Sequence, residues 1–304
     1  MSKVLIAGCG DIGMRVARLE LAAGMAVIGV VRGEAKAAWL QEGGVRPLLA
    51  DLDDPLSLAA LPTAGARVYY LAPPPGGGFS DPRVRNFCAA IGSERLPAKL
   101  VYVSTSGVYG DCGDLLVTEQ TPVNPQTSRA RRRLDAEQTL LAWGAERGVP
   151  VVILRVTGIY GPGRLPVARL AAGHPVLREE ESPRTNRIHA DDLAQVCVAA
   201  AEQAGHGEVF NVSDGEGGTM SQYFFAVADA LGMPRPQAIS LAEAKQSMNP
   251  LMLSYLSESR RMSNAQMLDR LGVKLRYPTL AAGLQATLAA MDHGREHLPP
   301  ARHD

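Results

Sequence analysis

The sequence GCGDIG at residues 8–13 restricts the fold of this chain more than any other stretch. It follows an unbroken apolar run at 3–8, which predicts a buried strand, and it precedes apolar residues at helical spacing across 12–23. A glycine pattern of this kind has meaning when it connects a strand to a helix, and that context is present here. The stretch therefore predicts a strand–turn–helix unit that binds a dinucleotide.

Each glycine of the pattern has its own expected role. Gly8 permits a tight turn, Gly10 lets the backbone approach a pyrophosphate, and Gly13 lets the helix pack closely on the strand. The helix amino terminus then offers free N–H groups and a positive dipole end to the phosphates. A purely structural turn is the alternative. The residues expected at the cofactor are Gly8, Cys9, Gly10, Asp11, Ile12 and Gly13.

Short β-branched runs alternate with helical patterns along the first half of the chain. Such alternation is typical of an α/β fold, a doubly wound parallel sheet of the Rossmann type with right-handed crossovers. The predicted strands are 3–8, 26–31, 45–50, 66–72, 99–105, 150–156 and 208–213, and the predicted helices follow Gly13 and cover 82–95, 127–147 and 192–203.

The second half of the chain is less regular and indicates a small lobe. We expect a dinucleotide-binding domain at 1–157 to which 186–213 returns. The remaining segments, 158–185 and 214–292, form a small, mostly helical lobe over the ligand-binding edge of the sheet. Within it, 158–166 reads as turns and 178–192 as a polar loop. The last residues, 293–304, have little periodicity and are expected to be loose.

Arg32 lies at the end of the second predicted strand, where NAD-binding proteins usually carry an acidic residue for the ribose 2′-hydroxyl. A guanidinium can hold a 2′-phosphate by charge-assisted hydrogen bonds, whereas a carboxylate would repel it. We therefore predict NADP, with NAD as the alternative cofactor and a solvated strand-end arginine as the alternative role. Asp51, after the third strand, is expected either at the adenine edge or as a helix cap. Leu52, Leu71, Ala72 and Pro73 complete the expected cofactor set.

The totals of the sequence argue against other classes of partner. Basic and acidic side chains balance at 31 each, which gives no general attraction for nucleic acid or an acidic membrane. Cysteines occur at 9, 88, 112 and 197, a spacing that indicates neither a zinc site nor a disulfide framework. No apolar stretch is long enough to cross a bilayer. We expect a soluble, cytoplasmic protein without a metal site.

With these residues in hand, the chain resembles the extended and atypical short-chain dehydrogenase/reductase family, which includes the NAD-dependent epimerases and dehydratases of nucleotide sugars. Five segments follow the order of that family. They are STSGVYGD (104–111), ILRVTGIYGPGR (153–164), NRIHADDLA (186–194), EVFNVSDG (208–215) and SNAQMLDRLGVKLRYPTLAAGL (263–284).

The resemblance implies catalytic positions, and two of them are altered here. The family uses a Ser or Thr after the fifth strand, which places Thr105 there with Ser106 as a neighbouring candidate. It also uses a Tyr-x-x-x-Lys pair on the next helix. Aligning that helix through Glu137 puts Arg129 at the tyrosine position and Arg133 at the lysine position, and no tyrosine of this chain has a lysine four residues later. Arginine can hold a ribose, but it stays protonated and cannot act as the acid or base.

Other side chains are candidates for the remaining roles. Tyr109 and His189 could carry a proton, against the alternatives of a packed aromatic residue and of a histidine that serves only local structure. Arg155 and Arg164 could hold a substrate phosphate, with His189 also near the substrate. For Thr105 the alternative is a strand-end hydroxyl that satisfies the local backbone.

These residues leave three functions open. The first is an NADP-dependent enzyme that transfers hydride to or from a nucleotide sugar or a related carbonyl substrate. The second is an NADP-binding regulatory or sensor protein without turnover. The third, ranked last, is a nucleic-acid binder that uses the arginines of 129–133. Homodimers are common in the family, and a homodimer is expected here on that ground alone.

Overall fold

The computed structural model describes residues 3–292, and a seven-stranded parallel sheet forms its centre. The strand order is β12-β7-β5-β4-β1-β2-β3. Adjacent strands are parallel throughout, as the alternating sequence pattern predicted. The strands are β1 (Lys3–Ala7), β2 (Ala26–Val31), β3 (Arg46–Leu49), β4 (Arg67–Tyr70), β5 (Lys99–Thr105), β7 (Val151–Val156) and β12 (Val209–Val212).

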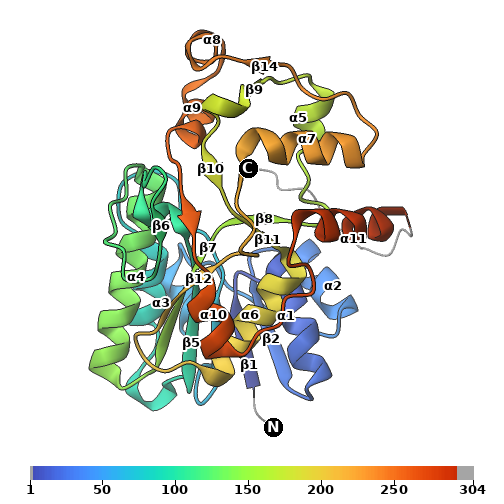
Figure 1. Cartoon of the computed structure of the whole chain (residues 1–304). Coiled ribbons are helices and arrows are strands. Elements are labelled where there is room, and N and C mark those ends of the chain that lie inside the picture. The colour runs from blue at the N-terminus through green and yellow to red at the C-terminus, as the bar shows by residue number, and fades with distance from the viewer. Residues whose placement is uncertain (1–2, 293–304) are drawn as a thin grey trace.

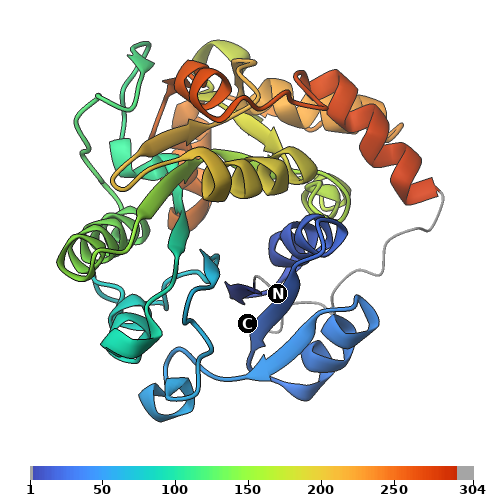
Figure 2. The ribbon, with the colours of Figure 1, turned by 90° about the horizontal axis from the view of Figure 1, so that it is seen from below.

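Helices lie on both sides of this sheet (Figure 2), because the strands are apolar on both faces. The α-helices are α1 (Asp11–Ala22), α2 (Glu34–Glu42), α3 (Pro82–Ala89), α4 (Ser128–Arg147), α5 (Val167–Ala171), α6 (Ala190–Gln203), α7 (Met220–Ala230), α8 (Leu241–Ser247), α9 (Pro250–Leu256), α10 (Ala265–Leu271) and α11 (Leu280–Asp292). Short 3-10 helices are η1 (Pro55–Leu58), η2 (Ser93–Arg95), η3 (Ser106–Tyr109) and η4 (Glu179–Glu181).

Two large hydrophobic cores lie on opposite faces of the sheet. Successive residues of a strand point to opposite faces, and β5 shows this directly. Val101 packs into the core that contains α1 and α6, whereas Leu100 and Tyr102 pack into the core that contains α3 and α4. Burial on both sides fixes the register of the strands and therefore the edge at which their carboxyl ends meet.

The carboxyl ends of the central strands form the ligand-binding edge expected of such a sheet. The strand β1 lies between β2 and β4, and the chain leaves it toward one side and later returns on the other. Ligands bind at such a switch point in open parallel sheets. The glycine turn after β1 lies at this point, with the ends of β2, β4 and β5 on either side.

A smaller, mostly helical region lies above this edge and carries α5, α7, α8 and α9 (Figure 1). The other described strands form two-stranded pairs instead of a second large sheet. These pairs are β8 (Gly158–Tyr160) with β11 (Arg187–His189), β9 (Val176–Leu177) with β14 (Ala238–Ile239), β10 (Arg184–Thr185) with β13 (Gly218–Thr219), and β6 (Leu116–Val117) with β15 (Arg261–Met262).

The structure differs from the sequence reading in three stretches. The segment 178–192, predicted as a polar loop, contains η4, β10 and β11, and α6 begins at Ala190. The stretch 82–95, predicted as one helix, is α3 followed by a bend and η2. The turn-rich segment 158–166 includes β8. Short strands of two or three residues give no periodicity long enough to recognise.

Two expectations concern the ends of the chain and the membrane. The expected loose tail, 293–304, lies outside the described residues. Among residues 3–292, no helix combines the length and the apolar character that a membrane crossing needs.

Candidate functional site

The glycine turn has the geometry that its sequence pattern predicts. Gly8 has φ +83°, and a Cβ there would lie 2.6 Å from the backbone nitrogen of Ala72, so only glycine fits. A Cβ at Gly13 would lie 3.1 Å from Cγ2 of Ile6, which explains the close packing of α1 on the sheet. A Cβ at Gly10, in contrast, would meet nothing within 4 Å. The open space beside Gly10 is therefore not taken up by the protein itself.

The amino terminus of α1 faces this space without a side-chain cap. Gly10 is the N-cap residue, and among residues 3–292 no side chain accepts a hydrogen bond from the first turn. The first N–H groups of a helix have no partner within the helix and attract anions. The thiol of Cys9 is buried, which raises its pKa to about 12 and makes it a packing group. Open space, free amides and helix dipole together fit a pyrophosphate.

Charged side chains connect the start of α1 to later segments of the chain. The carboxylate of Asp11 accepts hydrogen bonds from Nε of Arg15 at 2.9 Å and from Nε of Arg164 at 2.5 Å. Burial opposes the charge of Asp11, but the two guanidinium groups lower its pKa on balance. Arg15 also pairs with Asp191 at the start of α6. Arg164, expected at the substrate, thus lies beside the glycine turn.

The ends of β2 and β3 place Arg32 and Asp51 at the same edge. Arg32 is exposed and makes no hydrogen bond or ion pair within residues 3–292. Asp51 accepts a hydrogen bond from the backbone N–H of Asp53 at 3.0 Å. Asp54 caps the following helix η1, so the alternative role of Asp51 as that cap is wrong. Leu52 is buried beneath this turn.

The segment after β4 lies against the glycine turn. The backbone N–H of Leu71 donates to the carbonyl of Ala7 at 2.8 Å, and Ala72 is buried beside Gly8. Pro73 is exposed, and its carbonyl accepts a hydrogen bond from Arg83 at 3.0 Å. These three residues line the same edge of the sheet as the open space beside Gly10.

Thr105 and Ser106 lie at the end of β5. The hydroxyl of Thr105 accepts a hydrogen bond from the backbone N–H of Gly107 at 3.2 Å and thereby caps η3. A threonine hydroxyl that accepts one bond still has its own proton to donate. Both residues are partly exposed. Thr105 therefore combines the local backbone role with a free O–H donor.

Tyr109 is enclosed by protein. Its hydroxyl donates to Oδ1 of Asn211 at 2.8 Å and accepts from Nη1 of Arg155 at 3.0 Å, and the residue is 1% exposed. Burial raises its pKa, and Arg155 only partly offsets that effect. The position matches the alternative of a packed aromatic residue, and proton transfer to a substrate is not supported by it.

Arg155 is engaged inside the protein and does not point to a substrate. Its Nη2 pairs with Oε2 of Glu137 at 2.8 Å, and Glu137 is 1% exposed. Glu137 also accepts from the hydroxyl of Ser104 at 2.5 Å. The expectation that Arg155 holds a substrate phosphate is therefore not supported, because its donors already satisfy a buried carboxylate.

The arginines at the start of α4 all bind main-chain carbonyl oxygens. Arg129 binds Ser254 of α9, and Arg133 binds the carbonyl of Val103 at 2.9 Å. The other two contacts are Arg131 with the carbonyl of Pro125 and Arg132 with the carbonyls of Gly77 and Gly78. The helix is thus tied to the end of β5, to the loop after β4 and to the upper region. These four arginines therefore bind other parts of this chain.

His189 caps α6. Its Nδ1 accepts a hydrogen bond from the backbone N–H of Asp191 at 3.2 Å, and its Nε2 lies 3.4 Å from the hydroxyl of Thr287. It is 1% exposed, and burial lowers its pKa to about 4. The ring is neutral at neutral pH, and the cap of α6 is His189 itself.

The comparisons with known proteins agree with this arrangement. Residues 4–213 match the model of the NAD dependent epimerase/dehydratase family. The matched part covers more than half of the chain and includes the glycine turn, Thr105 and α4. This chain belongs to that family.

Other proteins are similar to this chain in sequence or in fold. Protein YeeZ of Escherichia coli (strain K12) is 28% identical over 245 residues, 78% of this chain and 86% of that protein. A conserved protein of unknown function from Silicibacter pomeroyi has 28% identity and a TM-score of 0.79, covering 96% of this chain and all of that one. UDP-glucuronic acid 4-epimerase from Bacillus cereus, solved with UDP-glucuronic acid and NAD, shares the fold at 18% identity, with a TM-score of 0.74 and coverage of 96% and 99%.

Sequence reasoning missed a buried polar cluster next to Arg133. Tyr102 lies on β5 and its hydroxyl accepts a hydrogen bond from Nη1 of Arg133 at 3.2 Å. Asp81 and Tyr70 lie nearby, and Oδ2 of Asp81 and the hydroxyl of Tyr70 have no partner among the described residues. Burial raises the pKa of Tyr102 to about 12, with Arg133 acting against it. A tyrosine on a buried strand looks like an ordinary core residue in sequence.

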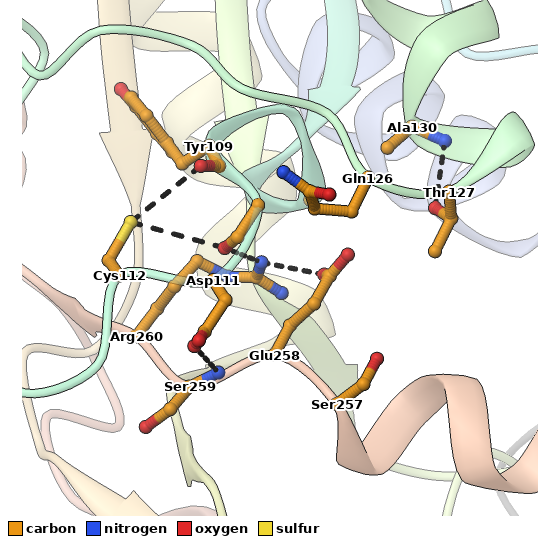
Figure 3. A network of polar contacts seen from close by, with 12 residues as sticks. Tyr109, Asp111, Cys112, Gln126, Thr127, Ala130, Ser257, Glu258, Ser259 and Arg260 are labelled. Atoms are coloured by element: carbon orange, nitrogen blue, oxygen red, sulfur yellow. Dashed lines mark hydrogen bonds and ion pairs between the residues drawn. The ribbon is translucent and has the colours of Figure 1, made fainter.

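A second missed group joins the upper region to the segment around η3 (Figure 3). Arg260 donates to the carbonyl of Gly110 and pairs with Glu258 at 2.7 Å. Asp111 accepts from the backbone N–H of Ser259 at 2.8 Å. Glu258 is buried, and one of its carboxylate oxygens has no partner within the described part of the chain. These contacts join segments about 150 residues apart, which no local pattern indicates.

Proposed function

We propose that this protein binds NADP in preference to NAD and transfers hydride to or from a nucleotide sugar or a related carbonyl or hydroxyl compound. The observation that supports this most is the space beside Gly10 at the uncapped start of α1, which fits the pyrophosphate of a dinucleotide. Arg32 supports the preference for a 2′-phosphate. The substrate class follows from relatives whose structures hold nucleotide sugars.

The coenzyme, when bound, supplies the hydride chemistry, and the chain supplies position and hydrogen bonds. The amides of α1 hold the pyrophosphate, and Leu52, Leu71, Ala72 and Pro73 line the edge beside it. Thr105 has an O–H that can donate to a reacting substrate oxygen while its lone pairs accept from Gly107. Arg133, at the lysine position of the family, provides a permanent positive charge at Tyr102 and Val103 of β5.

A catalytically inactive NADP-binding regulator is the second candidate. The observation that favours it is the engagement of Arg129 with Ser254, at the position where the family has a proton-carrying tyrosine. Losing a positioned acid–base group costs about 100- to 10,000-fold in rate. No other proton carrier among the weighed residues reaches solvent, because Tyr109 and His189 are both buried.

Calorimetric titration with NADP and NAD tests the binding part of the proposal. We expect NADP to bind about tenfold or more tightly than NAD, since one charge-assisted contact is worth that much. Binding of neither coenzyme would refute the proposal. Binding of NAD alone would refute the NADP preference.

Turnover separates the two candidates. The protein with NADPH or NADP is incubated with a panel of nucleotide sugars, with absorbance at 340 nm and chromatography of the sugars as readouts. Activity that falls about 100-fold in Thr105→Ala supports the enzyme. Tight coenzyme binding without turnover, unchanged in that variant, supports the regulator.

A further inference from the structure

Asp53 and Arg83 form a bidentate ion pair at the coenzyme edge of the sheet. Nε of Arg83 donates to Oδ1 of Asp53 at 2.8 Å, and Nη2 donates to Oδ2 at 2.5 Å. Asp53 follows β3 and Arg83 lies in the first turn of α3, so the pair connects the loop after β3 to α3. This fork geometry is the one by which arginine also binds phosphate oxygens.

The third donor of Arg83 is fixed independently of Asp53. Its Nη1 donates to the carbonyl of Pro73 at 3.0 Å, which holds the guanidinium in place from the opposite side. The two donors toward Asp53 would therefore keep their direction if the carboxylate moved away. A donor that needs no reorganisation binds an incoming anion at lower cost.

Arg32 lies close to the same carboxylate. Hydrogen bonds from Arg83 lower the pKa of Asp53, and the charge of Arg32 adds to that effect. Asp53 is partly exposed, with 44% of its side-chain surface accessible, while the Arg83 side chain is 16% accessible. Arg83 thus holds the Asp53 carboxylate by hydrogen bonds, and Arg32 acts on it by its charge alone, at an edge that solvent reaches.

The charges at this edge suit a dianion better than the present carboxylate does. A phosphate monoester carries about −1.5 to −2 charges at neutral pH. Arg32 and Arg83 together match that charge, whereas with Asp53 the three groups sum to one positive charge. A phosphate that approaches Arg32 would repel the Asp53 carboxylate and compete with it for the fork of Arg83.

We propose that Arg83 is a second ligand of the 2′-phosphate of NADP, and that Asp53 holds the donors of Arg83 until the coenzyme binds. The Asp53–Arg83 pair then sets the choice between NADP and NAD, because the carboxylate opposes the 2′-phosphate directly. This inference rests on the proposed coenzyme binding and adds to it the residues that decide selectivity.

A purely structural role for the pair is the competing explanation. The loop at 51–54 is already tied to α3, because Nδ2 of Asn86 donates to the carbonyl of Leu52 at 2.9 Å. The Asp53–Arg83 pair is therefore not the sole connection between the loop and the helix. A structural clasp would affect NAD and NADP binding alike, whereas a phosphate ligand would affect only NADP.

The test measures dissociation constants for NADP and NAD by calorimetry on the full chain at one fixed ionic strength. In Asp53→Asn we expect the ratio of NADP affinity to NAD affinity to rise about tenfold above that of the wild type. The reason is that the side chain at 53, which competes with the 2′-phosphate for Arg83, loses its charge. In Arg83→Met we expect NADP to bind about tenfold more weakly, with NAD changed by about twofold or less.

Asp54→Asn is the matched control. It makes the same charge change one residue away, and Asp54 contacts the backbone N–H of Leu56 and not Arg83. Asparagine caps a helix about as well as aspartate does. Equal effects of Asp53→Asn and Asp54→Asn on the NADP-to-NAD ratio would overturn the inference.

Two further outcomes have defined meanings. Equal weakening of both coenzymes in Arg83→Met would show a structural clasp and overturn the inference. If Arg83→Met does not fold, as judged by circular dichroism, the comparison of the two asparagine variants decides. If the wild-type protein binds neither coenzyme, the proposed function is refuted. If it binds them but the variants leave the ratio of NADP affinity to NAD affinity unchanged, only this inference is overturned.

Discussion

The two halves of the ligand edge use their polar groups in opposite ways. On the side of β1, β2 and β3, the start of α1 is uncapped, the space at Gly10 is open and Arg32 makes no hydrogen bond or ion pair within residues 3–292. On the side of β5 and β7, the arginines of α4 bind backbone carbonyls and Arg155 pairs with Glu137. Buried polar groups in native structures are usually satisfied, and the free amides at the start of a helix are a place where anions bind. We call the first side the open half, although Asp11 and Asp53 pair with arginines there, and the second side the self-binding half.

The largest expected effect tests the self-binding half through the buried pair of Glu137 and Arg155. Glu137→Leu should lower the free energy of unfolding by about 3–5 kcal/mol, because it leaves a buried guanidinium without its partner. Chemical denaturation monitored by circular dichroism measures this. A loss below about 1 kcal/mol would contradict the structural role of the pair and return Arg155 to the list of ligand-binding residues.

The next effect tests the open half at Gly10. Gly10→Val should weaken binding of both coenzymes about 100-fold by filling the space for the pyrophosphate, while stability changes by about 1 kcal/mol from the altered cap. Gly8→Val is the contrasting variant, since its Cβ would clash with Ala72 and its φ is +83°. That variant should lose stability as well. If calorimetry finds the same coenzyme affinity in Gly10→Val as in the wild type, the open space beside Gly10 does not hold the coenzyme.

A smaller effect concerns the pH dependence that His189 introduces. Its pKa is about 4 in the folded protein, lowered by burial, with Asp191 acting against that and Arg15 adding to it. The unfolded chain, with a histidine pKa near 6.5, binds the proton more tightly. The contribution of the neutral His189 ring to the free energy of unfolding is therefore fully present above about pH 6.5, and it is lost as the pH falls toward 4.

His189→Asn should remove that contribution, because the asparagine side chain can still cap α6 and does not titrate. The difference in unfolding free energy between wild type and variant should change by about 2 kcal/mol between pH 7 and pH 5. Denaturant titrations at the two pH values measure it. A difference that stays constant with pH would mean that His189 is accessible and charged in the folded state.

The smallest expected effect tests whether Arg129 contributes to coenzyme affinity. Arg129→Ala removes the hydrogen bonds to Ser254 and should cost about 1 kcal/mol of stability without changing NADP affinity. Thermal melts and calorimetry measure the two quantities. A clear loss of NADP affinity would show that the two halves are not separate, because a residue of the self-binding half would then support the coenzyme.

The features that sequence predicted are local, and those it missed depend on partners far along the chain. The glycine turn and the parallel strands follow from patterns within about twenty residues, and the structure reproduces both. The role of Arg155 depends on Glu137, and the role of Tyr109 depends on Arg155, 46 residues away. The pairing of Asp53 with Arg83 spans 30 residues. Sequence spacing contains no information on such pairs until the register of the sheet is known.

The bonds made by the arginines of α4 have a consequence for acid tolerance. Every one of the four binds a carbonyl oxygen, which gains no proton in the accessible pH range, and arginine loses none. The contacts of Asp11 and Asp53, in contrast, involve carboxylates that protonate in acid. Acidification should therefore loosen the contacts of Asp11 and Asp53 before it affects the bonds that the arginines of α4 make to carbonyl oxygens.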